Sequence, residues 1–576
     1  MRLPVLFLLM TFTPGIAQIT NHVHAGAAEK PAQTLPPPLM IAGVGSSHLT
    51  ITTSSPEAQR WFDQGLSLLH CFWDFEALRA FREAARLDPA CAMCQWGIHR
   101  AMEFGGSSED ELNPVVGKMK ELAPKASDRE QRYIRSIVES AGKKGEEASK
   151  AYRREMEALI YHYPDDLDAQ LFLALSMEGG FDEKGDPRPG ELYAMAMLRD
   201  ILRNHPDNAA ANHYWIHAVE GSEHPEWALE SAERLGNLTP GSGHMVHMPG
   251  HIFYRTGNYE QARKCFLNAI QVDEAYLRAQ KLQPRDDWNY SHNLSYLIAN
   301  SAEEGRAKEA VDYAAKLEPL AHDPAASDNP GFYVVQIGGT KPRLAIRFGQ
   351  WREAIDHPVD FGIPEDKLPL AAKAIRDGMV IYARAMLALD HDDLDGGARA
   401  SDQLDALLWR LMRDRTDQAD KTDKNLERLN HTAERVEKIL SVASKELAGN
   451  VASHSGNYDR AKVLLKQAVE AEKNLGYSEP PMYSRPALES LGYAAIRAGK
   501  WDQARDAFRQ VLAARPKSGF GYYGIALAYE KEGNRTAASQ AYAEFLDAWK
   551  YADEDLELVR AARAAKVVLD RERSSR

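Results

Sequence analysis

The chain has 576 residues, of which 44% are hydrophobic and 27% are charged, the composition of an ordinary soluble protein. Its formal net charge of -13 argues against broad nucleic-acid binding, which normally requires a basic surface. The sequence contains no zinc-finger, P-loop or dinucleotide-binding motif.

The N-terminus has the pattern of a secretory signal. Met1-Arg2 is followed by an apolar run over residues 3–10 and by small residues up to Ala17. A short positive region, an apolar core and a small-residue exit are typical of signal peptides, and the apolar run is too short to cross a bilayer. We therefore interpret residues 1–28 as a signal peptide and leader. We expect a periplasmic or secreted protein without a membrane span.

A spaced pattern of small and aromatic residues begins after Trp61. It consists of Gly65, Ala77, Phe81, Ala84 and Pro89, and it returns near the C-terminus as Gly492, Ala504, Phe508 and Pro516. Small residues let two antiparallel helices approach closely, the aromatic residue fills the hairpin, and the proline ends the second helix. The pattern resembles the tetratricopeptide repeat. That resemblance implies an all-α fold of stacked helical hairpins, wound into a right-handed superhelical solenoid with a concave binding surface.

The distribution of this pattern predicts the domain organisation. The pattern is clear in the first half of the chain, fades after it, and is clear again toward the C-terminus. We expect a flexible linker at residues 29–55, an N-terminal repeat array at 56–320, divergent helical hairpins at 321–420, a C-terminal repeat array at 421–550, and a C-terminal helix and tail at 551–576.

Two cysteines are separated by two residues, in Cys91-Ala92-Met93-Cys94. They follow Pro89, so we expect them at the start of a helix, where the pKa of a thiol is lowered. One hypothesis is a redox pair or a soft-metal site for copper(I). The other is a small structural disulfide, or two buried thiols, and the single C-x-x-C motif does not decide between them.

Histidines concentrate in two consecutive repeats. His213 and His217 are four residues apart, and His247 and His251 repeat this spacing 34 residues later. Side chains at i and i+4 share one helix face, and 34 residues is the period that places equivalent repeat positions side by side. We therefore expect these four imidazoles on one patch of the concave surface. The candidate metal ligands of this patch are His213, His217, His244, His247, His251 and His292.

The histidine patch has three interpretations. Imidazole suits copper, zinc and iron, so the favoured hypothesis is a transition-metal site. The alternatives are a groove for a peptide or a partner protein, and a structural network of histidines. Glu220 could be a ligand, the partner that orients an imidazole, or a catalytic general base. The H-E-x-x-H signature of zinc proteases is absent, and whether the chain is an enzyme stays open.

Two motifs give a closer resemblance. Residues 212–220 read Asn-His-Tyr-Trp-Ile-His-Ala-Val-Glu, and residues 243–252 read Gly-His-Met-Val-His-Met-Pro-Gly-His-Ile. They are similar to a family of exported bacterial tetratricopeptide-repeat proteins, and the similarity extends over about residues 56–550. It implies the fold and the importance of these positions, and it implies no particular reaction. Residues 70–74 depart from the family pattern, which has an Asn-His pair in this loop.

Overall fold

The computed structural model of the protein describes residues 36–182, 184–321, 333–418 and 424–574. Within these ranges the backbone forms helices, turns and loops, with an isolated bridge between Phe181 and Pro187 and no strand. The expected all-α class is therefore confirmed. No helix in these ranges combines the length and the apolar character needed to span a membrane. The signal peptide and leader, expected at residues 1–28, lie outside the described residues.

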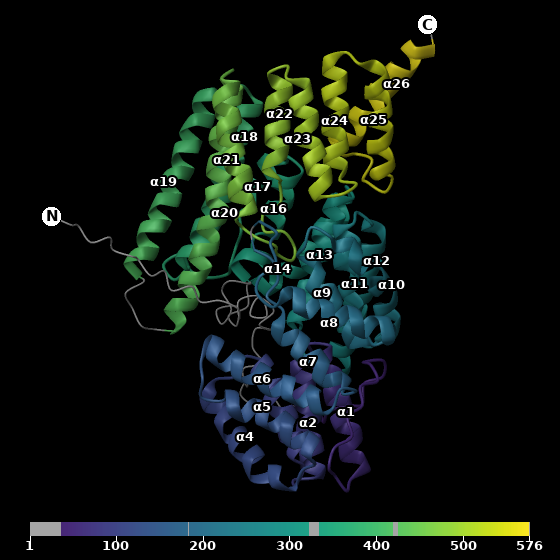
Figure 1. Ribbon diagram of the computed structural model, residues 1–576. Helices are drawn as coiled ribbons and strands as arrows, with labels where there is room; N and C mark the ends of the chain where they lie inside the picture. Colours follow the sequence, from purple (N-terminus) through teal and green to yellow (C-terminus); the bar gives the residue numbers. More distant parts are fainter. Residues whose placement is uncertain (1–35, 183, 322–332, 419–423, 575–576) are drawn as a thin grey trace, which may run out of the picture. The chain divides into compact units, whose positions relative to one another are not determined.

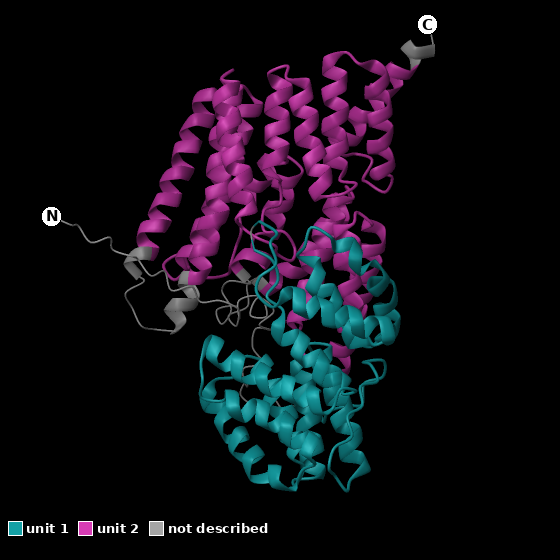
Figure 2. Cartoon of the chain, viewed as in Figure 1, with its two compact units in different colours: residues 1–245 teal, residues 246–576 magenta. Residues whose placement is uncertain are grey.

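The chain divides into two compact units, residues 1–245 and 246–576, which Figure 2 shows in different colours. The division falls inside helix α11 (Gly243–Arg255). The first unit contains α1 (Pro56–His70), α2 (Asp74–Leu87), α3 (Ala92–Phe104), α4 (Glu109–Leu122), α5 (Asp128–Ser140), α6 (Gly145–His162), α7 (Leu167–Met177), α8 (Glu191–Asn204), α9 (Ala209–Glu220) and α10 (Leu229–Leu238), with the short turns η2 (Ala123–Lys125) and η3 (Pro225–Ala228).

The second unit continues from α11 with helices of more varied length. They are α12 (Tyr259–Gln280), α13 (Trp288–Glu303), α14 (Ala307–Ala321), α16 (Thr340–Arg347), α17 (Trp351–Asp356), α18 (Leu370–Asp390), α19 (Leu394–Gln418), α20 (Lys424–His454), α21 (Tyr458–Lys473), α22 (Ala487–Arg497), α23 (Trp501–Ala514), α24 (Gly519–Glu532), α25 (Arg535–Ala548) and α26 (Glu557–Ser574), with the short turns η4 (Pro284–Asp286) and η6 (Tyr333–Ile337).

Consecutive helices pack as antiparallel hairpins within each unit (Figure 1). In α1–α2 a glycine on the first helix faces an aromatic ring on the second: a Cβ atom added to Gly65 would lie 2.7 Å from the Phe81 ring. The same relation holds for Gly492 and Phe508 at 2.6 Å, in α22–α23. Only a residue without a side chain allows the helices to approach this closely, which is why the repeat pattern requires glycine there.

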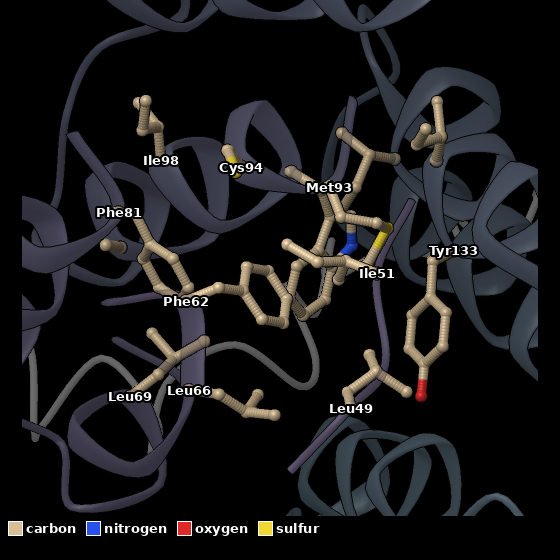
Figure 3. Packing of buried hydrophobic residues seen from close by; sticks show 14 of the residues in the cluster. Leu49, Ile51, Phe62, Leu66, Leu69, Phe81, Met93, Cys94, Ile98 and Tyr133 are labelled. Carbon is tan, nitrogen blue, oxygen red and sulfur yellow. The ribbon is translucent and has the colours of Figure 1, made fainter. Parts of the chain in front are cut away.

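The segment that precedes α1 is packed, in contrast to the flexible linker expected at residues 29–55. In its described part, Val44, Leu49 and Ile51 are buried in the core of the first unit. Figure 3 shows Leu49 and Ile51 among side chains of that core, with Phe62 and Tyr133. The proline run suggested an unpacked linker. The burial of three separated apolar side chains is nevertheless enough to hold this extended segment against the core.

A buried ion-pair cluster joins helices of the second unit. The Glu303 carboxylate, at the end of α13, accepts hydrogen bonds from Arg347 at 3.3 Å and from Arg515 at 2.7 Å. Arg347 also donates to Glu489 at 2.9 Å. Burial alone raises the pKa of Glu303, but the two guanidinium groups outweigh it and hold the pKa below its usual value of 4.5.

Candidate metal centre

The first histidine triad lies in the first unit, on two helices. Helix α9 begins after Asn208, whose side chain accepts a hydrogen bond from the backbone of Ala211. It carries His213 and His217 one turn apart, so both rings lie on the same helix face. His244, at the start of α11, completes the group, and the potential ligand atoms of the three residues all lie within 4.8 Å of one another.

The three imidazoles point the same nitrogen atom toward one another. Nε2 of His213 lies 3.0 Å from Nε2 of His217 and 3.1 Å from Nε2 of His244. Two nitrogen ligands on one tetrahedral ion, at bonds of 2.0–2.1 Å, stand about 3.3 Å apart. The observed separations are close to this value, and the site is buried, with His213 at 0% and His244 at 4% exposed.

Hydrogen bonds on the far side of the rings fix the proton positions. Nδ1 of His213 donates to the backbone carbonyl of His70 at 2.7 Å, and Nδ1 of His217 donates to the carboxylate of Glu220 at 2.7 Å. A neutral imidazole that donates from Nδ1 has only a lone pair on Nε2. The Nε2 atoms of His213 and His217 therefore face each other with their lone pairs, an arrangement that a shared cation would stabilise.

A second layer of contacts holds the His213 side of the triad. Nε2 of His70 donates to Asp168 at 3.0 Å, and its Nδ1 accepts the hydroxyl of Tyr214 at 2.9 Å. Burial raises the pKa of Tyr214 well above its usual value, so the hydroxyl remains a donor. The ring of Phe72 packs against all three imidazoles, with centroid distances of 4.5 Å to His213, 5.3 Å to His217 and 5.9 Å to His244.

Acidic side chains surround Glu220 on the other side of the triad. Burial raises the pKa of Glu178 well above its usual value, and the neighbouring carboxylates of Glu191 and Glu220 raise it further. Both effects favour the protonated form of Glu178. The Glu191 carboxylate accepts the backbone N–H groups of Gly179 and Gly180 at 2.8 and 2.5 Å.

The second triad lies in the second unit and consists of His247, His251 and His292. All three residues are buried, and their ring centroids are 4.5 to 5.8 Å apart. Nε2 of His247 and Nε2 of His251 are 2.5 Å apart, closer than the roughly 3.3 Å expected for two ligands of one ion. A carboxylate oxygen of Glu479 lies 3.6 Å from Nδ1 of His251 and 4.0 Å from Nε2 of His292. The first triad thus has the more regular ligand geometry.

The structure brings the six candidate ligands together in groups of three, one group within each unit. In each triad an i, i+4 pair is completed by a histidine from the next repeat. Glu220 takes the orienting role, as the acceptor for His217. His224 joins neither group: it pairs with Glu226 at 2.9 Å, and its side chain is 54% exposed.

Cys91 and Cys94 form a disulfide, and both residues are buried. Cys91 caps α3, and its sulfur accepts the backbone N–H of Cys94 at 3.0 Å, which confirms the expected place at a helix start. Joined sulfur atoms offer no thiolate to a metal ion. The disulfide argues against a soft-metal site and against two free thiols, and both a structural disulfide and the oxidised form of a redox pair agree with it.

Sequence reasoning did not identify Phe72 or Glu479 as members of the sites. Phe72 lies in the α1–α2 loop, and Glu479 lies in the loop before α22, far along the chain from the histidines they accompany. No spacing rule connects residues so distant in sequence. For Phe72 a signal was present in the sequence, because residues 70–74 depart from the pattern of the exported family.

Comparison with known proteins identifies the repeats. The tetratricopeptide-repeat family matches residues 245–284, which contain α11 and α12, and residues 487–518, which contain α22 and α23. These two segments match the tetratricopeptide repeat. None of the curated proteins matches it.

Several solved repeat structures are similar to parts of the chain. Yeast Tom70 is 12% identical over 90% of this chain and 99% of that chain, with a TM-score of 0.27. The TPR domain of P58(IPK) is 11% identical over 90% and 99%, with a TM-score of 0.21. A human IFIT1 dimer with PPP-AAAA is 12% identical over 85% and 95%, with a TM-score of 0.33. With TM-scores this low, the fold assignment rests on the helical hairpins and on the two family matches.

Proposed function

We propose that this tetratricopeptide-repeat protein binds a transition-metal ion, copper, zinc or iron, through its histidine triads. The observation that carries the proposal is the convergence of three Nε2 atoms in the first triad, at 3.0 and 3.1 Å. Borderline imidazole ligands suit all three metals. Three ligands of one kind leave a further coordination position on a four-coordinate ion, so both metal storage and metal-assisted chemistry are compatible with the site.

The support for the first triad extends to its outer contacts. Metal-binding histidines usually donate their second ring nitrogen to a carboxylate or a backbone carbonyl. His217 donates to Glu220, and His213 donates to the carbonyl of His70. Between His213 and His217, a purely structural network would need a proton on one of the two facing Nε2 atoms, whereas both tautomers place the proton on Nδ1. A metal ion would accept both lone pairs without a further proton.

Elemental analysis of the purified full-length chain tests the proposal. After exposure to zinc, copper(II) or iron(II) and removal of free ions, we expect bound metal near stoichiometric amounts. His213→Ala should lose the ion of the first triad and His251→Ala that of the second. His224→Ala is the matched control, since it removes an exposed histidine that belongs to neither triad, and it should bind as the wild type. A chain that retains no metal under any of these conditions would exclude the proposal.

A second candidate function is the binding of a peptide or a partner protein by the repeats. Its support is the presence of the repeats themselves, because stacked hairpins form extended surfaces that commonly bind peptides. A partner whose binding survives both His213→Ala and His247→Ala would favour this function over metal binding.

Export of the chain, expected from residues 1–17, is part of the proposal. The Cys91–Cys94 disulfide supports it, because disulfides persist mainly in oxidising compartments. Fractionation of cells that express the full-length chain should place the protein in the periplasm or the medium. Retention of the whole product in the reducing cytoplasm would refute export and leave the metal proposal untouched.

A further inference from the structure

An apolar cavity in the second unit has a guanidinium group in its wall. The cavity is lined by η6, α16, α18, α20 and the loop before α22, and its volume is ≈ 60 Å³. One water occupies roughly 10–15 Å³ by this measure, so the space holds about five waters or a small organic molecule. A folded partner protein is far too large for it.

The walls of this cavity are mainly hydrocarbon. Ile375 and Met379 come from α18, Leu440 and Ala443 from α20, and Val335 from η6. None of the described residues that line it is acidic. An apolar space with a small number of polar groups is typical of small-molecule sites, where the polar groups fix the orientation of the ligand.

Two arginines line this cavity, Arg343 and Arg485. The carboxylates of Glu446 and Glu489 lie near Arg485, whereas Arg343 contacts neutral acceptors. Its Nη1 donates to the carbonyl of Val335 at 2.6 Å, and its Nη2 donates to the carbonyl of Gln336 at 2.5 Å and, more weakly, to the hydroxyl of Thr340 at 3.5 Å. All these acceptors are neutral, and no carboxylate of the described residues forms an ion pair with it. Burial lowers the pKa of Arg343 to about 10, so the group still carries its charge at neutral pH.

The neighbouring arginines show what is missing at Arg343. Arg343 and Ser484 also line a second cavity of ≈ 70 Å³, together with Arg347 and Arg515. Those two guanidinium groups have carboxylate partners: both pair with Glu303, which lines the second cavity too, and Arg347 also pairs with Glu489. Arg343 is half-buried and has no carboxylate partner among the described residues, and an anion in the cavity would supply that partner.

We propose that the apolar cavity binds a small organic carboxylate, with its charged group at Arg343 and its apolar body between α18 and α20. The planar guanidinium matches a carboxylate in geometry and can donate two parallel hydrogen bonds to it. Ser484, which lines the same cavity, adds a hydroxyl donor. The hydrocarbon walls select an apolar body over a fully hydrated anion. The site is independent of the histidine triads.

Titration calorimetry of the full-length chain with benzoate tests the proposal. Benzamide has nearly the same shape without the charge, and we expect saturable binding of benzoate with none of benzamide at the same concentrations. Arg343→Gln should weaken benzoate binding about tenfold or more, since a hydrogen bond to a charged group contributes at least that factor. Arg352→Gln is the matched control, because Arg352 is exposed on α17 and outside the cavity, and it should bind as the wild type.

A second variant keeps the test decisive if Arg343→Gln does not fold. Ala443→Leu leaves the guanidinium in place and fills the cavity, so it should abolish benzoate binding while thermal unfolding shows a folded protein. Benzoate that fails to bind the wild type, benzamide that binds equally well, or Ala443→Leu that binds as the wild type would each overturn the proposal. Inorganic phosphate that displaces benzoate with equal affinity would also overturn it, because the apolar walls would then contribute nothing.

Discussion

Replacing Glu220 by glutamine perturbs the first triad without removing any imidazole. The Glu220 carboxylate accepts Nδ1–H of His217 at 2.7 Å, and the two side chains are only 3% and 5% exposed. A carboxylate in this position fixes the tautomer of the imidazole and raises the basicity of the nitrogen that binds the ion. Loss of such an orienting partner typically costs about 10–100-fold in metal affinity, or ~1.4–2.7 kcal/mol. We expect Glu220→Gln to weaken metal binding by this factor.

Competition with a chromophoric chelator measures the affinity of the full-length chain for zinc and for copper(II). The matched control is Glu226→Gln, which removes the carboxylate partner of His224, an exposed pair at 2.9 Å outside the triads. This control should leave the affinity unchanged. If Glu220→Gln binds as tightly as the wild type, or if both variants lose the same amount, then Glu220 does not orient a metal ligand and the reasoning from the Nδ1 hydrogen bonds is wrong.

Three further predictions follow from packing and charge. Gly65→Ala should lower the free energy of unfolding by about 1–3 kcal/mol, because the added methyl group would overlap the Phe81 ring. A Cβ atom added to Gly117 would have no other atom within 4 Å, so Gly117→Ala should not lower the free energy of unfolding. Urea denaturation of the two variants tests this difference. The pKa of Glu303 is lowered in the folded state, so its stabilising contribution is present above pH 4.5 and is lost as the pH falls below that value. Glu303→Gln should therefore be less stable than the wild type at pH 7. Urea denaturation at pH 3 should show a smaller difference in the free energy of unfolding. Burial raises the pKa of Cys71 and of Cys265 to about 12, so neither thiol should react with iodoacetamide at pH 8 in the native chain. Mass spectrometry should find no label on the native chain and two labels after denaturation. Reduction of the Cys91–Cys94 disulfide in the denatured chain should raise the number to four.

The hairpins could be predicted from the sequence because the repeat pattern records short-range packing. Gly65 faces Phe81 and Gly492 faces Phe508, and each pair has the same separation along the chain. A helix pair joined by a short turn admits few arrangements, so a glycine and a ring at fixed spacing are almost sufficient to specify the contact. Residues 36–55 could not be predicted in this way, since their burial depends on three isolated apolar side chains without periodicity.

The candidate ligands could also be named from the sequence, but their grouping could not. The i, i+4 pairs follow from helix geometry alone, and α9 and α11 both present them. His244 and His292 occupy the same early position in the first helix of their repeats, and each completes the triad whose pair comes from the preceding repeat. Within each unit, the structure joins the middle of one repeat to the beginning of the next.

This pattern has a consequence for how the two triads would bind ions. Both use an i, i+4 pair and one histidine from the following repeat, but they differ in the spacing of their Nε2 atoms and in the side chains that contact them. In the first triad the Glu220 carboxylate accepts a hydrogen bond from Nδ1 of His217. The ring of Phe72 packs against the first triad, whereas the carboxylate of Glu479 lies near His251 and His292 in the second. A carboxylate adds negative charge and a hard oxygen donor, which zinc and iron accept more readily than copper(I) does. We therefore expect the two triads to differ in metal affinity. When zinc and copper(I) are offered together, His213→Ala, which keeps the second triad, and His251→Ala, which keeps the first triad, should retain different metals.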